Sequence, residues 1–436
     1  MAKIAIIGGG YTGLTAAYRL TKLGHQVHVF ERGSEVGGLA ADFTVAGAHL
    51  EKTYHHLFRT DTDIIGLTAE LGIEDTLGWH TGSLKTYYNH RLHDFSTPVD
   101  LLKFTPLPLW DRIRTALVAL YLNRTKNWRQ FVDVSAYEWM KKFNGRRAAQ
   151  VIWEPLLKGK FDERYKEVSM AWLWARLHIR SRSRRPGEMK EKLGYFAGGF
   201  HTFTRALVEK ITAQGGTIHT GAEVTSIAEH KDGVSVTVDG TEAVFDRLLA
   251  TVPSHVFADL AGPGLASEYR DRLAGIDYLG AVVMVFTSEQ KIGDAYWYNI
   301  NDLTKPFLVF INHTNLIDRR NYAGRYVYYI GTYRPHEHRS FTLSDDQLSD
   351  EWFTELARIF PEFDRDKIEE RHIFRLKNAQ HIVTTDYEDR IPAMQTPLKH
   401  VWLANFSQIY PEDRGTNYAV REGTKAAQLI TDSLAP

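Results

Sequence analysis

The chain has 436 residues, more than one hydrophobic core usually organises, so its length favours two closely joined domains. Its 53 Lys and Arg residues balance 53 Asp and Glu residues, which gives no electrostatic reason to expect nucleic acid as a partner. It has no cysteine, which excludes disulfides, thiolate catalysis and cysteine-ligated zinc. The sequence shows neither a signal peptide nor an apolar run of about 20 residues, so we expect a cytoplasmic protein that is at most peripheral to a membrane.

The N-terminal residues have the pattern of a βαβ unit, with a strand, a helix and a strand at residues 3–8, 12–25 and 26–31. The first turn contains Gly8, Gly10 and Gly13, which match the spacing G-x-G-x-x-G. Such glycines permit a tight turn, admit a pyrophosphate to the backbone and let the helix pack on the strand. Glu31 ends the second strand, where a carboxylate can accept hydrogen bonds from ribose hydroxyls. The unit predicts dinucleotide binding; the alternative is a glycine-rich turn of another α/β fold.

A glycine pair, Gly37 and Gly38, follows six residues after Glu31. Here the chain resembles a group of flavoproteins that includes FAD-dependent amine oxidases, protoporphyrinogen oxidases, phytoene desaturases and UDP-galactopyranose mutases. Those proteins carry a glycine pair beside the pyrophosphate and the flavin. The resemblance implies FAD as the cofactor, and we also assign Arg32 in this loop to the cofactor-binding residues.

The segment 47–61 resembles a glycine–histidine–phenylalanine segment beside the isoalloxazine of the mutases. Its His55 and His56 can donate hydrogen bonds to flavin or substrate, or move a proton near neutral pH. We predict a catalytic role for these histidines, and a structural role in capping a loop is the alternative. Weaker candidates in the same segment are His49, Glu51 and Tyr54.

Residues 99–131 alternate apolar clusters with the basic residues Arg112, Arg114, Arg124, Lys126 and Arg129. We favour an ordinary helix that roofs the active site. The alternative is a basic amphipathic helix in peripheral contact with an anionic membrane surface.

Residues 153–169 resemble a segment that borders the substrate cavity of protoporphyrinogen oxidases. Lys158 and Lys160 lie there and can hold an anionic group of a substrate. The alternative is a helix end at which lysines favour the negative terminus of the dipole.

Two later blocks extend the resemblance. In residues 193–240 a glycine pair precedes a helix and alternating strands, and the resemblance implies that the backbone of Val224 contacts the adenine. In residues 400–430 a strand leads to a helix whose N-terminus, in the family, points at the flavin pyrimidine and stabilises reduced flavin. The residues matched to that terminus are Thr416, Asn417 and Tyr418, where the family often has glycine.

Residues 296–338 predict a sheet with aromatic faces, similar to the substrate-domain sheet of the family. Tyr298, Asn299 and His313 are assigned to the substrate pocket, and Arg414 to a substrate anion or the flavin. The HEH run at 336–338 offers two histidines without a third ligand, so we predict no metal site.

Together these blocks predict an α/β protein with two domains. A Rossmann-like FAD-binding domain would use residues 1–60, 190–255 and 385–436. An α+β substrate domain over the flavin would use residues 61–189 and 256–384.

The function predicted is that of an FAD-dependent oxidoreductase that takes a hydride from a carbon of a small-molecule substrate to flavin N5. The substrate would be an amine, an isoprenoid-like chain or a ring system. One alternative keeps the fold but is a reduced-flavin nucleotide-sugar mutase. Another is a non-catalytic prenyl-binding protein similar to the GDP-dissociation inhibitors, against which the intact glycine fingerprint argues.

Overall fold

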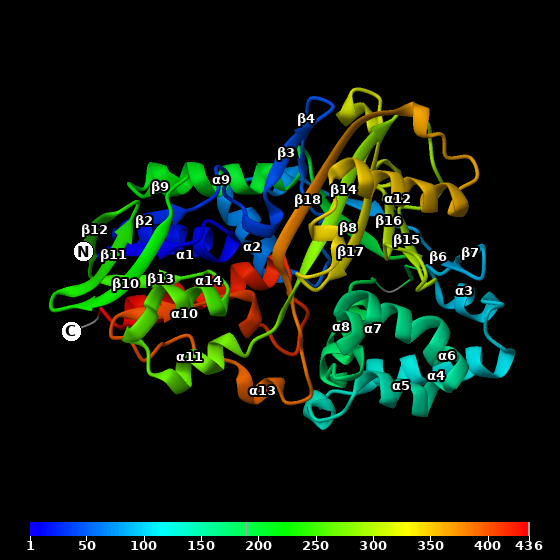
Figure 1. The fold of residues 1–436 in the computed structure, drawn as a ribbon, viewed down its shortest axis with the longest axis horizontal. Helices are drawn as coiled ribbons and strands as arrows, with labels where there is room; N and C mark the ends of the chain where they lie inside the picture. Colours follow the sequence, from blue (N-terminus) through cyan, green and yellow to red (C-terminus); the bar gives the residue numbers. More distant parts are fainter. Residues whose placement is uncertain (186, 189, 435–436) are drawn as a thin grey trace.

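A computed structural model describes residues 1–185, 187–188 and 190–434 of the chain. Near the two termini lies a five-stranded parallel sheet in the order β19-β13-β1-β2-β9 (Figure 1). Its strands are β1 (Lys3–Ile7), β2 (Gln26–Glu31), β9 (Thr217–Thr220), β13 (Arg247–Ala250) and β19 (Val401–Leu403). The strand–helix–strand unit predicted at the N-terminus is confirmed, with α1 (Tyr11–Lys22) between β1 and β2. The α/β class is therefore as predicted.

The parallel sheet is covered on both faces. Alternate side chains of a strand point to opposite faces, so neighbouring residues of β1 belong to different hydrophobic clusters. Ile4 and Ile6 of β1 join one hydrophobic cluster with α1, α9 (Phe200–Ala213) and α14 (Thr416–Asp432). Ala5 and Ile7 join another, with the three-stranded sheet β10–β12 and α10. The bounds of those elements are β10 (Val224–His230), β11 (Gly233–Val238), β12 (Thr241–Phe245) and α10 (Ser254–Ala261).

A second, seven-stranded sheet has the order β18-β14-β17-β16-β15-β6-β7 (Figure 1). On its strand β14, Val282 and Met284 join one hydrophobic cluster with α12 (Asp345–Ile359), whereas Val283 and Val285 belong to the same cluster as α1 and α14. One face of this sheet therefore adjoins the hydrophobic core formed by the parallel sheet with α1, α9 and α14. The strands are β6 (Leu84–Tyr88), β7 (Arg91–Asp94), β14 (Tyr278–Ser288), β15 (Trp297–Ile300), β16 (Val309–Asn312), β17 (Tyr326–Arg334) and β18 (Ile368–His381).

A helical lobe lies beside this sheet, on the opposite side of the molecule from the two termini (Figure 1). Its own core contains Met140, Phe161 and Trp172. The helices are α3 (Pro98–Lys103), α4 (Leu109–Arg124), α5 (Ala136–Asn144), α6 (Arg146–Ala148), α7 (Glu154–Phe161) and α8 (Met170–Arg182).

The remaining elements are β3 (Asp42–Val45), β4 (Ala48–Glu51), α2 (Thr62–Leu71), β5 (Leu77–Thr81), β8 (Lys192–Phe196), α11 (Ser267–Ala274) and α13 (Tyr387–Arg390). Within the described residues, no helix combines the length and the apolar character needed to cross a membrane. The strands of the parallel sheet fall in the segments assigned to the FAD-binding domain. The proposed domain limits remain a prediction, and parts of them, at residues 186, 189 and 435–436, lie outside the described residues.

Candidate functional site

Two glycine segments meet at the N-terminus of α1. Gly37 pairs with Gly10 in an isolated bridge, and its N–H donates to the Gly9 carbonyl at 2.8 Å. Gly37 has a φ of 113°, a conformation that L side chains rarely adopt. A Cβ on Gly13 would lie 2.1 Å from the Gly8 carbonyl oxygen, so α1 can pack this closely only with glycine. The result is a surface of bare backbone at a helix terminus, where a pyrophosphate can bind to free N–H groups.

Glu31 lies at the end of β2 beside this surface. Its Oε2 accepts a hydrogen bond from the Gly9 N–H at 2.7 Å, and its Oε1 accepts one from the Gly33 N–H at 2.7 Å. Arg32 is largely exposed and lies 4.0 Å from Glu223, next to Val224 at the start of β10. The donors and the carboxylate fit FAD, and their assignment to cofactor contacts remains a prediction.

The helix α14 presents a second terminus. Its N-cap is Gly415, which has no side chain to satisfy the first N–H groups. The Asn417 side chain accepts hydrogen bonds from the backbone of Asp63 at 2.9 Å and Ile64 at 3.1 Å, so it caps α2. Any contact of Asn417 with flavin would therefore use its backbone. Thr416 and Tyr418 are the neighbouring residues of this terminus, and burial raises the pKa of Tyr418.

His55 and His56 follow β4 and are uncharged at neutral pH. Burial lowers the pKa of His55 to about 4, and its Nδ1 lies 2.8 Å from the Thr53 carbonyl oxygen. Burial, with the nearby Arg180, lowers the pKa of His56 to about 3, and its Nδ1 lies 3.2 Å from the Tyr296 hydroxyl. A neutral imidazole both donates and accepts hydrogen bonds, so these residues are suited to orient a group rather than to act as imidazolium acids.

Three cations surround one carboxylate where α7, α8 and the start of α14 meet. Lys160 forms an ion pair with Asp413, and Arg176 Nη1 lies 2.8 Å from the same Asp413 oxygen. Trp172 Nε1 donates to the other oxygen at 3.3 Å. Arg414 donates instead to the Tyr333 hydroxyl, at 2.8 Å. Among the described residues, Asp413 is the one carboxylate paired with Lys160 and Arg176, and Arg414 is its electrostatic neighbour. We call Lys160, Arg176, Asp413 and Arg414 the cationic cluster.

Burial is costly for the cationic cluster. It lowers the pKa of Lys160 to about 7; Arg176 and Arg414 add to this effect, and Asp413 opposes it. Burial by itself would raise the pKa of Asp413, but the neighbouring cations hold it well below its usual range. Charged groups held at such a cost are typical of functional sites.

Further polar groups lie around the cationic cluster. The buried His381 has two ring nitrogens without a hydrogen-bond partner among the described residues, and the same is true of Arg414 Nε. Burial lowers the pKa of His381 to about 3, and Asp413 and Arg414 are among the charges that act on it. Tyr54 stacks edge-on against Trp297 at 5.1 Å, and burial raises its pKa well above its usual value. Tyr333 and Arg414 are its electrostatic neighbours, which links the histidine segment to the cationic cluster.

Sequence reasoning did not assign Arg176, Tyr333 or His381 to the site. Arg176 directly follows the apolar run MAWLWA of α8. A charged residue next to a buried run indicates a candidate site residue, so the sequence does carry a signal for Arg176. Tyr333 and His381 lie at or near the ends of β17 and β18, where nothing in the sequence marks them as site residues.

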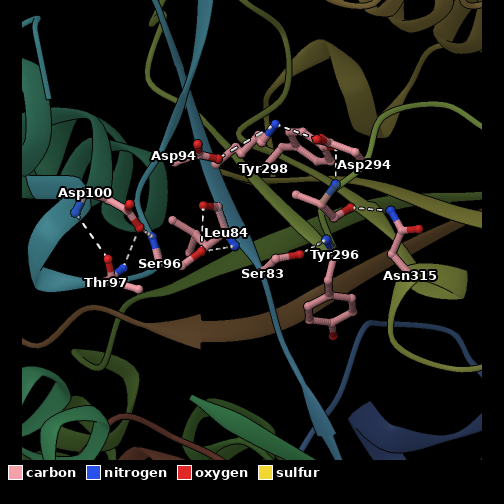
Figure 2. Close-up of polar contacts among 12 residues, drawn as sticks. Ser83, Leu84, Asp94, Ser96, Thr97, Asp100, Asp294, Tyr296, Tyr298 and Asn315 are labelled. Carbon is pink, nitrogen blue, oxygen red and sulfur yellow. Dashed lines mark hydrogen bonds and ion pairs between the residues drawn. The ribbon is translucent and has the colours of Figure 1, made fainter. Parts of the chain in front are cut away.

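Other predicted substrate residues have different surroundings. Lys158 pairs with Glu163 at 2.6 Å. Tyr298 is fully buried; its hydroxyl accepts from the Ala295 N–H at 2.6 Å and donates to Asp294 at 3.2 Å (Figure 2). Asn299 accepts from Trp297 Nε1 at 2.8 Å. Such contacts are typical of a hydrophobic core or of the edge of a sheet. The assignment of Lys158, Tyr298 and Asn299 to substrate binding stays a prediction.

His313 and the HEH run also have defined partners. His313 is buried with its Nε2 2.8 Å from the Tyr322 hydroxyl. His336 Nε2 lies 2.6 Å from the Lys377 carbonyl oxygen, whereas His338 Nδ1 lies 2.9 Å from Ser340 Oγ. The two histidines of the run therefore contact different residues. A separate group of metal-ligand type, Asp42, His49 and His201, links β3, β4 and α9 by hydrogen-bond distances of 2.6 and 3.1 Å.

Comparison with known proteins places these features in a family. The chain is 26% identical over 317 residues to a flavin-dependent L-tryptophan oxidase of Lentzea aerocolonigenes, which covers 65% of either chain. The chain spans 60% of the length of the first curated relatives that it matches.

Solved structures share its fold. An oxidoreductase from Methanosarcina mazei superposes with a TM-score of 0.77 at 16% identity, covering 98% of this chain and 100% of that one. A reduced UDP-galactopyranose mutase superposes with a TM-score of 0.76 at 16% identity, covering 100% and 97%. The model of the family described as flavin containing amine oxidoreductase matches residues 11–431. As predicted, the chain belongs to this family, whose members are FAD-dependent oxidoreductases.

Proposed function

We propose that this protein is an FAD-dependent oxidoreductase whose substrate carries an anionic group. The observation that supports this proposal is the cationic cluster, in which three cations face one carboxylate. Arg414 and Lys160 are suited to hold a carboxylate or a phosphate, because guanidinium and ammonium groups make strong charge-assisted hydrogen bonds to such anions.

The glycine surface at α1, Glu31 and the N-terminus of α14 would hold FAD, which supplies the hydride acceptor when bound. The chain's own residues would position the substrate. The aromatic rings of Tyr54 and Trp297 exclude water, and the neutral His55 and His56 orient polar groups. Such positioning lowers the activation barrier by removing orientational freedom before the reaction.

An amine that also carries a carboxylate agrees with both the family and the cationic cluster. The tryptophan oxidase relative acts, by its name, on such a compound. A simple polyamine would bring positive charge to a site with an excess of cations.

A mutase that acts on a nucleotide sugar is the second candidate. The same cations would suit a diphosphate, and the mutase fold superposes over the whole chain. Reaction stoichiometry separates the two, because an oxidase transfers electrons in each turnover and a mutase does not.

The experiment begins with the visible spectrum of purified protein. We expect a flavin band that bleaches when an anionic amine such as an L-amino acid is added without oxygen. Turnover of a nucleotide sugar only after prior reduction would instead support the mutase. A protein that binds no added FAD would refute both proposals.

A further inference from the structure

Exposed apolar side chains gather on one part of the helical lobe. Of the thirteen large hydrophobic side chains exposed in the described part of the chain, eight lie between residues 99 and 121. The most exposed of these are Trp110 at 71%, Leu109 at 62% and Leu117 at 60%. Scattered single exposures are ordinary on a protein surface, but a concentration of this kind marks an interaction site.

The helix α4 presents six of these residues along one side, and the other two, Val99 and Leu102, belong to the neighbouring α3. Trp110, Ile113, Leu117 and Tyr121 are spaced by three or four residues, which places them on the same helical face. On the other side, α4 packs against α3, α5, α6 and α8, and Thr115 and Leu122 are buried. The apolar face therefore belongs to a helix that is already fixed in the fold. We call this surface the α4 apolar face and define it by the six exposed residues of α4, with Val99 and Leu102 of α3 beside them: Leu109, Trp110, Ile113, Leu117, Leu120 and Tyr121.

The surroundings of the α4 apolar face are strongly basic. Residues 98–148 contain ten Lys and Arg against four Asp and Glu, a net charge of +6 in a chain whose total is zero. Eight of these basic residues are exposed: Lys103, Arg124, Lys126, Arg129, Lys141, Lys142, Arg146 and Arg147. Arg124 lies on the same helical face as Trp110 and Leu117, two turns beyond Leu117.

Water solvates the basic residues well but not the cluster of exposed apolar side chains, and one occupant suits both. The interfacial region of an anionic bilayer accepts Trp and Leu side chains and attracts Lys and Arg beside them. A second copy of this chain would bring the same positive charge to the contact, which disfavours self-association here.

We propose that the α4 apolar face docks this protein onto the surface of membranes rich in anionic phospholipid. The ordinary roofing helix favoured by the sequence would instead bury these residues. Since α8 carries Arg176 and packs against α4, the docking surface and the cationic cluster belong to the same lobe. The proposal does not depend on which reaction the protein catalyses.

The test is co-sedimentation of the full-length, flavin-loaded protein with vesicles of phosphatidylcholine alone or with about a third phosphatidylglycerol. We expect binding to the anionic vesicles that weakens as salt is raised. The double variant Trp110→Glu/Leu117→Glu should bind at least about tenfold more weakly. Arg124→Gln/Lys126→Gln should also lose affinity, by about fivefold for each charge. All of these residues are exposed, so melting temperature and flavin content should be unchanged.

A matched control is Leu303→Glu/Leu429→Glu, which alters two exposed leucines outside the α4 apolar face. This control should bind vesicles like the wild type. The proposal is overturned if the wild type fails to bind anionic vesicles, or if both double Glu variants bind equally well. It is also overturned if light scattering shows a dimer that Trp110→Glu/Leu117→Glu dissociates, since the face would then be a contact between copies.

Discussion

Replacing Lys160 with methionine should stabilise the flavin-free protein while it removes anion binding. The Lys160 side chain is only 14% exposed, and its pKa falls from 10.5 to about 7 in the fold. Because the unfolded chain binds this proton more tightly, the charged lysine lowers stability by about 4 kcal/mol at pH 7. Methionine keeps the aliphatic stem and removes this cost. Asp413 retains its ion pair with Arg176 at 2.8 Å and its hydrogen bond from Trp172.

The pH dependence identifies the cause of this stabilisation. Above its folded pKa, Lys160 is neutral in the native state. The amount by which it lowers the free energy of unfolding therefore falls to about 2 kcal/mol at pH 9 and vanishes above the unfolded pKa. Thermal denaturation of wild type and Lys160→Met between pH 7 and 9 should show a gap in melting temperature that roughly halves as pH rises. A variant less stable than the wild type at pH 7, or a gap that does not change with pH, would refute this reasoning.

Three further expectations concern the cofactor, the substrate and the acid limit of the fold. Gly13→Ala should lose flavin, measured by absorbance, because its Cβ would lie 2.1 Å from a carbonyl oxygen; Gly66→Ala, with open space around it, is the control that should keep flavin. Arg414→Met should weaken binding of the anionic substrate by about tenfold to a hundredfold, since a hydrogen bond to a charged group contributes about 1.5–3 kcal/mol; equal weakening in Lys158→Met would contradict the cationic cluster as the site. Stability should fall as pH drops below about 6.5, because His55–His56 bind protons in the unfolded chain but, with pKa values of about 4 and 3, not in the fold. Replacing both histidines with glutamine should make that decline less steep in thermal melts, while the buried His313 and His381, with pKa values of about 3, keep contributing to it; an unchanged slope would exclude His55 and His56 as a cause.

The N-terminal βαβ unit could be predicted because its signals are local. Gly8, Gly10, Gly13 and Glu31 lie within one βαβ unit, where spacing along the chain determines spacing in the fold. The strand β1 also has the continuous apolar character of a strand buried on both faces.

The cationic cluster could be predicted only in part. The sequence marks Lys160 and Arg414 as separate candidates, but 254 positions separate them, and no periodicity indicates that both approach Asp413. Arg176 is a single charge after an apolar run. Conversely, Tyr298 and His313 carried the expected chemistry, yet their hydroxyl and imidazole groups are satisfied by buried neighbours.

Residues 99–131 show a different limit of sequence reasoning. The alternation of apolar and basic residues predicts an amphipathic helix, but it does not say which side faces the core. The packing of α4 on α5 and α8 buries Thr115 and Leu122 and leaves Trp110 and Leu117 exposed. Tertiary packing, rather than periodicity, decides that the more apolar side faces outward.

If the cationic cluster binds the substrate, as proposed, its charge restricts which amines can be accepted. A simple ammonium group about 4 Å from Arg414 would be repelled by about 4 kcal/mol at an effective dielectric constant of about 20, and Lys160 would repel it likewise when protonated. Asp413 can offset only part of this, because it already pairs with Lys160 and Arg176. A carboxylate or phosphate on the substrate reverses the balance, since it favours the protonated form of Lys160 and so offsets the cost of burying that charge. Anion binding above pH 7 should therefore take up a proton, and the affinity for an anionic substrate should fall as pH rises through that range.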